Sequence, residues 1–300
     1  MARDVLVDPA DGRHALHDGR RHDRCGQARE AAARGEPAAP PGASPVPGDG
    51  SPPLRRAAAL LALAVLCAAP VPPPADPPAP ISKLQPAPEL DAFLAQVAAE
   101  TVEEFAKAGL TAEGLSIALI DLTPGKAGVP HPTGGFRADE SSYPCSVVKI
   151  CFLSFYEAQK EAGRFTDNPE LVRAVRDMIT ISSNDATGFV VDSITGTTSG
   201  PEIADAAEWK KWQARRNVVN DYYRVRGYVN LNANQKTFCE DAYGREQAFR
   251  DGGRNRNRMS AAEAARLFKE IARGEVAGPT LTDEMMTLLA RDITDRKSVV

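Results

Sequence analysis

The sequence predicts an α/β (α+β) domain in which helices pack on an antiparallel sheet. Three observations lead to this class. A segment with helical periodicity begins at residue 88, two strand-like segments follow at 115–122 and 134–140, and a series of helical segments begins at Val147. Because the first helix directly precedes the hairpin of strands, we expect it to cover one face of the sheet.

The first three elements are defined by periodicity and turn residues. Apolar side chains recur at helical spacing through residues 88–109, and Gly109 ends that run. The segment "LSIALIDL" (115–122) is apolar and short, which is typical of a strand, and "TPG" then turns the chain. "GGFRADE" (134–140) is the expected second strand.

The later helices follow from apolar runs and capping residues. Residues 147–162 are apolar on most sides, so we expect a buried helix there, and 168–180 forms the next one. "ISSND" (181–185) interrupts the pattern before a further helix at 186–194. Ser260 and Glu263 form a predicted capping box for a helix that ends at Gly274. Thr282 is the expected cap of the last helix.

The N-terminal third has a different composition. Residues 1–53 are rich in Ala, Pro and Gly without apolar periodicity, which predicts disorder or a start codon placed too early. Residues 54–69 combine two arginines with a short apolar run, the layout of a signal peptide, and 70–83 form a stiff Pro-rich linker. We therefore expect an exported protein, periplasmic or extracellular, without a stable membrane span. A membrane anchor through Cys67 and an ordinary Ala-rich helix remain alternatives.

Charge and cysteine content exclude several classes. The 300-residue chain has a net charge of −4, which argues against a nucleic-acid partner. Its five cysteines form no C-x-x-C pair, so we expect neither a metal site nor another cofactor. Cys145, Cys151 and Cys239 are interpreted as small buried residues, with a possible pair involving Cys239.

Ser146 and Lys149 lie three residues apart at the start of the apolar helix, in "YPCSVVKI" (143–150). Residues at this spacing share a helix face, so the lysine amine can reach the serine hydroxyl. Burial lowers the pKa of a lysine and lets it act as a base, while amides at a helix start can stabilise an oxyanion. The pair is thus a candidate nucleophile and base, although S-x-x-K also occurs by chance.

Ser182 and Asn184 lie in the break between two helices. A serine there can carry a proton between lysine, nucleophile and leaving nitrogen, and an asparagine amide can orient a substrate carbonyl. The alternative is a helix cap, because Ser183, Asn184 and Asp185 all cap helices well. Both interpretations can hold together, since a capping loop is a rigid place for a polar site.

"YPCSVVKI" followed by "MITISSNDAT" resembles the serine β-lactamase and penicillin-binding-protein superfamily, in particular its class A β-lactamase-like branch. The resemblance covers about residues 88–292. It implies an all-α subdomain beside the sheet, with Ser146, Lys149 and Ser182 as catalytic residues and Asn184 as the substrate-binding residue. Ser183 stands where the family motif has an aspartate.

The third family motif, K-T-G or K-S-G, does not follow residue 184. We expect a truncated domain at 84–294 that lacks the last sheet strands, is inactive as it stands and is prone to aggregation. Residues 295–300, "DRKSVV", match what the start of a common sequencing adapter encodes, so we interpret them as an artefact. A real short tail is the alternative.

The implied activity is hydrolysis of a β-lactam through an acyl-enzyme, by a monomer. A D-alanyl-D-alanine peptidase acting on cell-wall peptide and a non-catalytic binding module are the alternatives. The family's deacylating glutamate has no clear counterpart, because Thr237 occupies its expected place. Glu240, Asp241 and Glu246 lie nearby and are more simply explained as salt-bridge residues.

Three other features carry less weight. His131 is expected in an exposed loop, which leaves a Ser-His-Asp triad without support. Trp209 and Trp212 indicate core packing rather than a lid. "RDGGRNRNR" (250–258) is locally basic and is either a solvated loop or a contact for an acidic ligand or cell-wall polymer.

Overall fold

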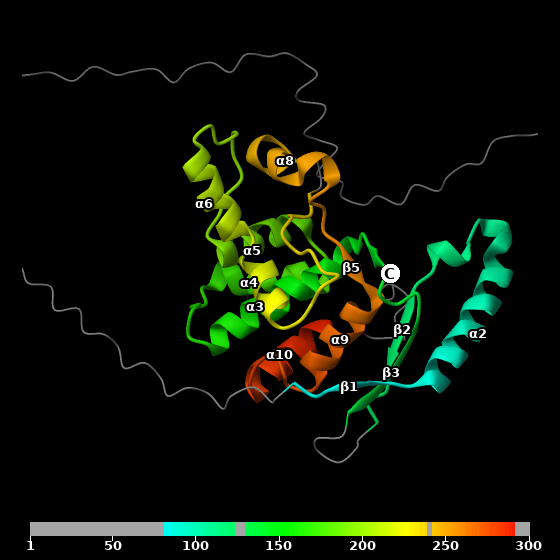
Figure 1. Ribbon diagram of the computed structural model, residues 1–300. Helices are drawn as coiled ribbons and strands as arrows, with labels where there is room; N and C mark the ends of the chain where they lie inside the picture. The colour runs from blue at the N-terminus through cyan, green and yellow to red at the C-terminus, as the bar shows by residue number, and fades with distance from the viewer. Residues whose placement is uncertain (1–80, 124–129, 239–241, 292–300) are drawn as a thin grey trace, which may run out of the picture. The chain divides into compact units, whose positions relative to one another are not determined.

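The computed structural model describes residues 81–123, 130–238 and 242–291 (Figure 1). Helices and small sheets are combined in this part of the chain, so the predicted mixed α/β class is confirmed. The signal-peptide-like segment, most of the Pro-rich linker, Cys239 and the 295–300 tail lie outside the described residues.

Within the described part of the chain, the main sheet has the strand order β1-β3-β2. Its strands are β1 (Leu84–Pro86), β2 (Ile117–Ile120) and β3 (His131–Phe136). β2 and β3 are antiparallel, with Ile117 opposite Phe136, whereas β1 runs parallel to β3. The strand predicted at 134–140 therefore begins earlier, and His131 is its first residue rather than part of a loop.

Two glycines bring the first helix, α2 (Pro88–Phe105), close to the sheet. A Cβ added at Gly134 would lie 2.5 Å from the Cβ of Leu90, so only glycine permits this approach. The backbone amide of Gly135 donates to the Asp91 carboxylate at 2.8 Å. α2 packs on β3, and α9 (Ala261–Ala272) packs on β2 from the other side, as Figure 1 shows. The prediction that the first helix covers the sheet is confirmed.

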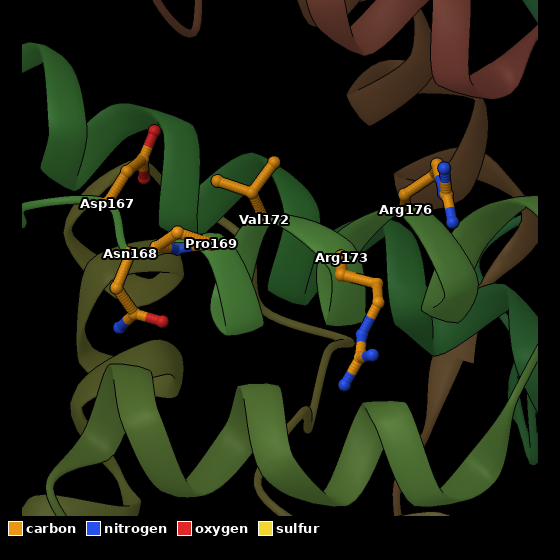
Figure 2. Close-up of a pocket in the computed structure, with 6 residues that line it drawn as sticks. All are labelled: Asp167, Asn168, Pro169, Val172, Arg173 and Arg176. Atoms are coloured by element: carbon orange, nitrogen blue, oxygen red, sulfur yellow. The ribbon is translucent and has the colours of Figure 1, made fainter.

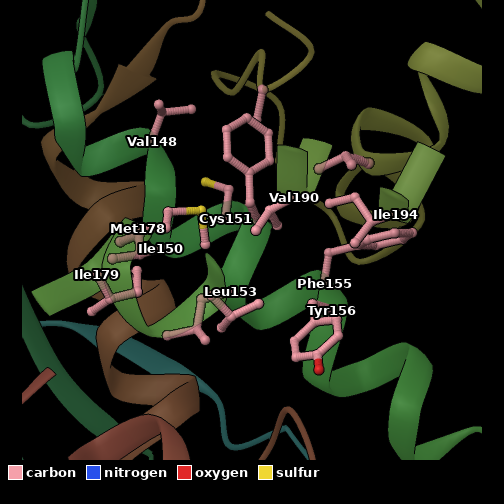
Figure 3. Packing of buried hydrophobic residues seen from close by; sticks show 14 of the residues in the cluster. Val148, Ile150, Cys151, Leu153, Phe155, Tyr156, Met178, Ile179, Val190 and Ile194 are labelled. Atoms are coloured by element: carbon pink, nitrogen blue, oxygen red, sulfur yellow. The ribbon is translucent and has the colours of Figure 1, made fainter. Parts of the chain in front are cut away.

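The helical part surrounds α3 (Lys149–Glu161), in which every residue from Lys149 to Glu157 is buried. A helix that is apolar on most sides must be enclosed by other elements, as predicted for this segment. Figure 3 shows the core side chains meeting around Cys151, Leu153 and Met178. The remaining helices are α4 (Pro169–Thr180), α5 (Asn184–Thr195), α6 (Ala206–Arg216), α7 (Val218–Val225), α8 (Gly244–Arg250) and α10 (Pro279–Leu289).

Capping residues fix three helix starts where the sequence predicts them. The side chains of Asn168, Ser183 and Ser260 each accept a backbone hydrogen bond in the first turn of α4, α5 and α9. The prediction for Thr282 is wrong: α10 begins at Pro279, and the Thr282 hydroxyl donates back to the carbonyl of Ala277 at 3.0 Å. Proline is well suited to a first helical position, which explains the earlier start.

A second, two-stranded sheet joins the segment before Ser146 to the start of α9. It consists of β4 (Ser141–Ser142) and β5 (Met259–Ser260), paired antiparallel. This pairing holds the start of α9 against the chain that leads into α3. Among the described residues, no helix combines the length and apolarity needed to cross a membrane.

Candidate active site

Ser146 lies in a tight turn that leads into α3. Residues Cys145–Val148 form a 3₁₀ turn, so the α-helix starts at Lys149, two residues later than predicted. Cys145 has a φ of +49°, a left-handed conformation that is uncommon outside glycine. It is exposed, as is Ser146, so the prediction of a buried residue is wrong for Cys145 and right for Cys151. The turn presents the Ser146 hydroxyl at the surface.

Lys149 is buried, at 2% exposure, with its amine directed at the break between α4 and α5. Its Nζ donates to the Ser182 carbonyl oxygen at 2.6 Å, to Ser182 Oγ at 2.9 Å and to Asn184 Oδ1 at 3.0 Å. A lysine ammonium has three donors, and these three oxygens match them. These hydrogen bonds hold the buried Lys149 amine in place beside Ser182 and Asn184.

Ser182 joins the lysine to the candidate nucleophile. Its Oγ lies 2.9 Å from Ser146 Oγ and 2.9 Å from Lys149 Nζ. A hydroxyl both donates and accepts, so this chain of three atoms can carry a proton in either direction. Ser182 also has a left-handed backbone with a φ of +54°. Such strain costs about 1–3 kcal/mol and is concentrated at functional sites.

The "ISSND" break serves both purposes that its sequence allows. Ser183 Oγ accepts from the Ala186 amide at 3.2 Å and caps α5. Because Ser183 is the cap, Ser182 and Asn184 are available for the site. The Asn184 Nδ2 lies 3.5 Å from the Phe238 carbonyl oxygen, so the asparagine is held between Lys149 and the loop of Phe238. The structure thus brings all four predicted site residues together.

The candidate deacylating carboxylates do not converge on this group in the described residues. Glu240 and Asp241 lie outside them. Glu246 is fully buried and pairs with Arg216 at 2.7 Å, which makes it a salt-bridge residue as expected, although in the interior. The Thr237 hydroxyl is buried without a hydrogen-bond partner.

The other polar and aromatic candidates, His131, Trp209 and Trp212, make contacts within the fold. His131 Nδ1 lies 3.1 Å from the Asp121 carbonyl oxygen at the edge of the sheet. Trp209 and Trp212 stack with ring centroids 5.3 Å apart, and Trp212 is buried, which confirms their interpretation as packing residues. Sequence reasoning missed Phe238, because no local pattern indicates a contact with a residue 54 positions earlier.

A separate hollow of about 600 Å³ lies at the start of α4. Figure 2 shows Asp167, Asn168 and Pro169 grouped at the helix start, with Arg173 and Arg176 further along the helix. None of its lining residues belongs to the Ser146 group. The serine and lysine site is therefore separate from this hollow.

Comparisons with known proteins address the family. The solved structure of PBP-A has a TM-score of 0.41 and 17% identity, covering 72% of this chain and 73% of its own. A variant of the last common ancestor of Gram-negative bacteria class A β-lactamase also has a TM-score of 0.41 and 17% identity, over 64% and 68% of the two chains. A mutant of that ancestor is 16% identical at a TM-score of 0.41, over 64% and 69%.

No match was found among curated proteins. Residues 157–298 match the model of the β-lactamase enzyme family, a range that begins after Ser146 and Lys149. The matched range contains Ser182 and Asn184 but not Ser146 and Lys149. The Ser146 and Lys149 motif is therefore supported by its geometry alone, and the Ser182 and Asn184 motif by both its geometry and the family match. This match supports the resemblance carried by the motifs: over residues 157–298, just under half of its length, the chain is similar to the β-lactamase enzyme family.

Proposed function

We propose that the chain is a serine hydrolase of the class A β-lactamase-like type, in which Ser146 forms an acyl-enzyme with a β-lactam. One observation carries the proposal: the unbroken chain from Ser146 Oγ through Ser182 Oγ to Lys149 Nζ, with both links at 2.9 Å. A weak nucleophile becomes reactive when a base within hydrogen-bond reach removes its proton.

The proposed reaction gives each member of the group a role. Lys149 first loses one of its three amine protons, and Ser146 Oγ then attacks the lactam carbonyl while its own proton moves through Ser182 Oγ to Lys149 Nζ. When the carbon–nitrogen bond breaks, Ser182 passes a proton to the lactam nitrogen and recovers one from Lys149. Asn184 donates from its amide to a substrate carbonyl and accepts from Lys149, which fixes both reactants. Water then hydrolyses the ester and restores Ser146.

A D-alanyl-D-alanine peptidase is the second candidate. Glu246 is buried in an ion pair with Arg216, so this carboxylate is not placed to activate water. Slow release of the acyl group is the behaviour expected when a water-activating base is lacking. A non-catalytic binding module is the third candidate, because no K-T-G or K-S-G follows residue 184 in this sequence.

A labelled penicillin tests these functions. The missing third motif predicts an inactive chain, whereas the assembled group of Ser146, Ser182 and Lys149 predicts acylation. On the second ground, the 300-residue chain is expected to take up the label covalently, with none on a Ser146→Ala variant. Lys149→Met should slow labelling by about 100-fold or more, since general-base catalysis contributes about 10²–10⁴-fold. Ser142→Ala, an exposed serine just before the site, serves as the matched control.

The rate of label release then separates the two enzymes. Release within seconds supports a β-lactamase, whereas a label that persists while a D-alanyl-D-alanine peptide is cleaved supports a peptidase. A chain that melts cooperatively yet takes up no label would contradict both and leave a binding module.

We also propose export, on the strength of the signal-peptide-like composition of residues 54–69. N-terminal sequencing of the product recovered outside the cytoplasm should show cleavage within or just after this segment. Recovery only in the cytoplasm, with residues 54–69 intact, would contradict export.

A further inference from the structure

A polar cavity of about 150 Å³ lies at the edge of the Ser146 group. Tyr143, three residues before Ser146, forms part of its lining. Phe238 forms another part, and its carbonyl oxygen lies 3.5 Å from Asn184 Nδ2. Phe238 thus lies between the two: its backbone carbonyl faces the proposed substrate-orienting asparagine, and the residue also lines the cavity.

The described lining residues of this cavity include three cations and no carboxylate: Lys236, Arg250 and Arg256. The charge of Lys236 is neutralised, because its Nζ lies 2.5 Å from Asp192 and 2.8 Å from Ser199 Oγ. Arg250 and Arg256, by contrast, make no ion pair with any of the described residues. Among the described lining residues, the positive charge that has no ion-pair partner therefore comes from two arginines.

Arg250 and Arg256 differ from Arg254, which lies in the same basic segment. Arg254 pairs with Asp251, through Nε at 2.8 Å, and does not line the cavity. Arg256 lies over the Tyr143 ring, with its guanidinium carbon 4.1 Å from the ring centroid. Stacking uses the flat face of a guanidinium and leaves its N–H edge free to donate.

We propose that this cavity binds a carboxylate on the acyl side chain of the substrate, held by Arg250 and Arg256. This rests on the proposed function, which places the acyl group of the substrate at Asn184, beside Phe238 of the cavity lining. A guanidinium presents paired donors that match the two oxygens of a carboxylate. The space is close to that of about five water molecules, which admits a carboxylate and its carbon but not a large ring. The basic segment 250–258 thus contributes a ligand contact rather than only a solvated loop.

Two penicillins that differ by a single carboxylate test the proposal. Carbenicillin is benzylpenicillin with a carboxylate added to its side chain. The quantity compared is the ratio of their rate constants for acylation of Ser146. In an Arg250→Gln/Arg256→Gln variant, we expect this ratio to fall by about tenfold, the effect of losing a charge-assisted hydrogen bond. Arg254→Gln, from the same segment, should leave the ratio unchanged.

A ratio that is unchanged in the double variant overturns the proposal. So does an equal fall in Arg254→Gln, because that result shows a general effect of surface charge. A cooperative melt of each variant confirms that it is folded.

A second measurement does not depend on acylation. Phenylacetamide and its α-carboxy derivative are titrated by NMR into the Ser146→Ala variant. We expect the carboxylated fragment to bind about tenfold more tightly, and the double arginine variant to lose that preference. Equal binding of the two fragments overturns the carboxylate site even where penicillin acylates Ser146. A preference for the carboxylated fragment, with no acylation by either penicillin, upholds the site and refutes the proposed enzyme.

Discussion

The ion pair between Arg216 and Glu246 should be the polar contact of the helical part whose disruption costs the most stability. Both side chains are fully buried, and they are joined by two hydrogen bonds, Nη2–Oε1 at 2.7 Å and Nη1–Oε2 at 3.1 Å. Arg216 also donates to Thr197 and Asp192, so its charge is fully engaged. The pair connects α6 to α8 and lies next to Lys236, which leads into the Phe238 loop.

Removing one partner should destabilise the fold far more than removing both. Arg216→Met leaves the Glu246 carboxylate buried with only Ser199 and the more distant Lys236, 3.7 Å away. Breaking a buried pair in this way costs about 3–5 kcal/mol, whereas replacing both charges with apolar groups is often neutral. We expect Arg216→Met and Glu246→Leu each to lose about 3–5 kcal/mol. The double variant should come within about 2 kcal/mol of the parent chain.

Denaturant unfolding of the four proteins provides the double-mutant cycle. The exposed pair of Arg224 and Asp221 serves as the control, and its removal should cost less than about 1 kcal/mol. In thermal melts, each single change should lower the melting temperature by roughly 6–20 °C for a domain of this size. If the free-energy costs of the two single changes simply add in the double variant, the reasoning is refuted.

Three further changes test the packing and electrostatics of the described residues. Burial raises the pKa of Glu157 to about 7 from a usual 4.5; the ion pair with Lys160 opposes this shift, and the nearby Glu284 and Asp167 carboxylates add to it. The stability that Glu157 contributes should therefore be complete below about pH 4.5 and should decline by about 3 kcal/mol as the pH rises through 7. Glu157→Gln should remove this slope in denaturant unfolding, and an unchanged slope would count against the assignment. Leu153→Ala, at a fully buried position, should cost about 2–5 kcal/mol by the same measurement, and a loss below 1 kcal/mol would contradict its core position. Glu263→Ala should cost about 2–4 kcal/mol, because the backbone amides of Val229 and Asn230 both donate to its carboxylate at 2.7 Å; no loss would show that water replaces these bonds.

Features set by local chemistry could be predicted from the sequence. Ser183 caps α5 because its hydroxyl reaches an amide three residues away, and the Ser260 cap of α9 follows the same rule. The burial of α3 follows from an apolar composition on all sides. Lys149 and Ser182 were linked by the order of the family motifs, and the structure places them in contact.

Features set by distant contacts could not be predicted. His131 belongs to a strand because β3 pairs with β1, where Leu84 lies opposite it, and a Pro- and Gly-rich sequence gives no sign of that pairing. The burial of Glu246 depends on Arg216, thirty residues earlier, and nothing local distinguishes it from a surface carboxylate. The capping box at Ser260 was only half right, since the Glu263 side chain binds the amides of Val229 and Asn230.

Intact-mass spectrometry after incubation with benzylpenicillin tests the central claim most directly. If Ser146 is the nucleophile activated through Ser182 and Lys149, the chain should gain the mass of one penicillin, and peptide mapping should locate it on Ser146. The Ser182→Ala variant should gain it much more slowly, and Ser146→Ala should gain nothing. A folded chain with no added mass, or an adduct that persists in Ser146→Ala, would contradict the account.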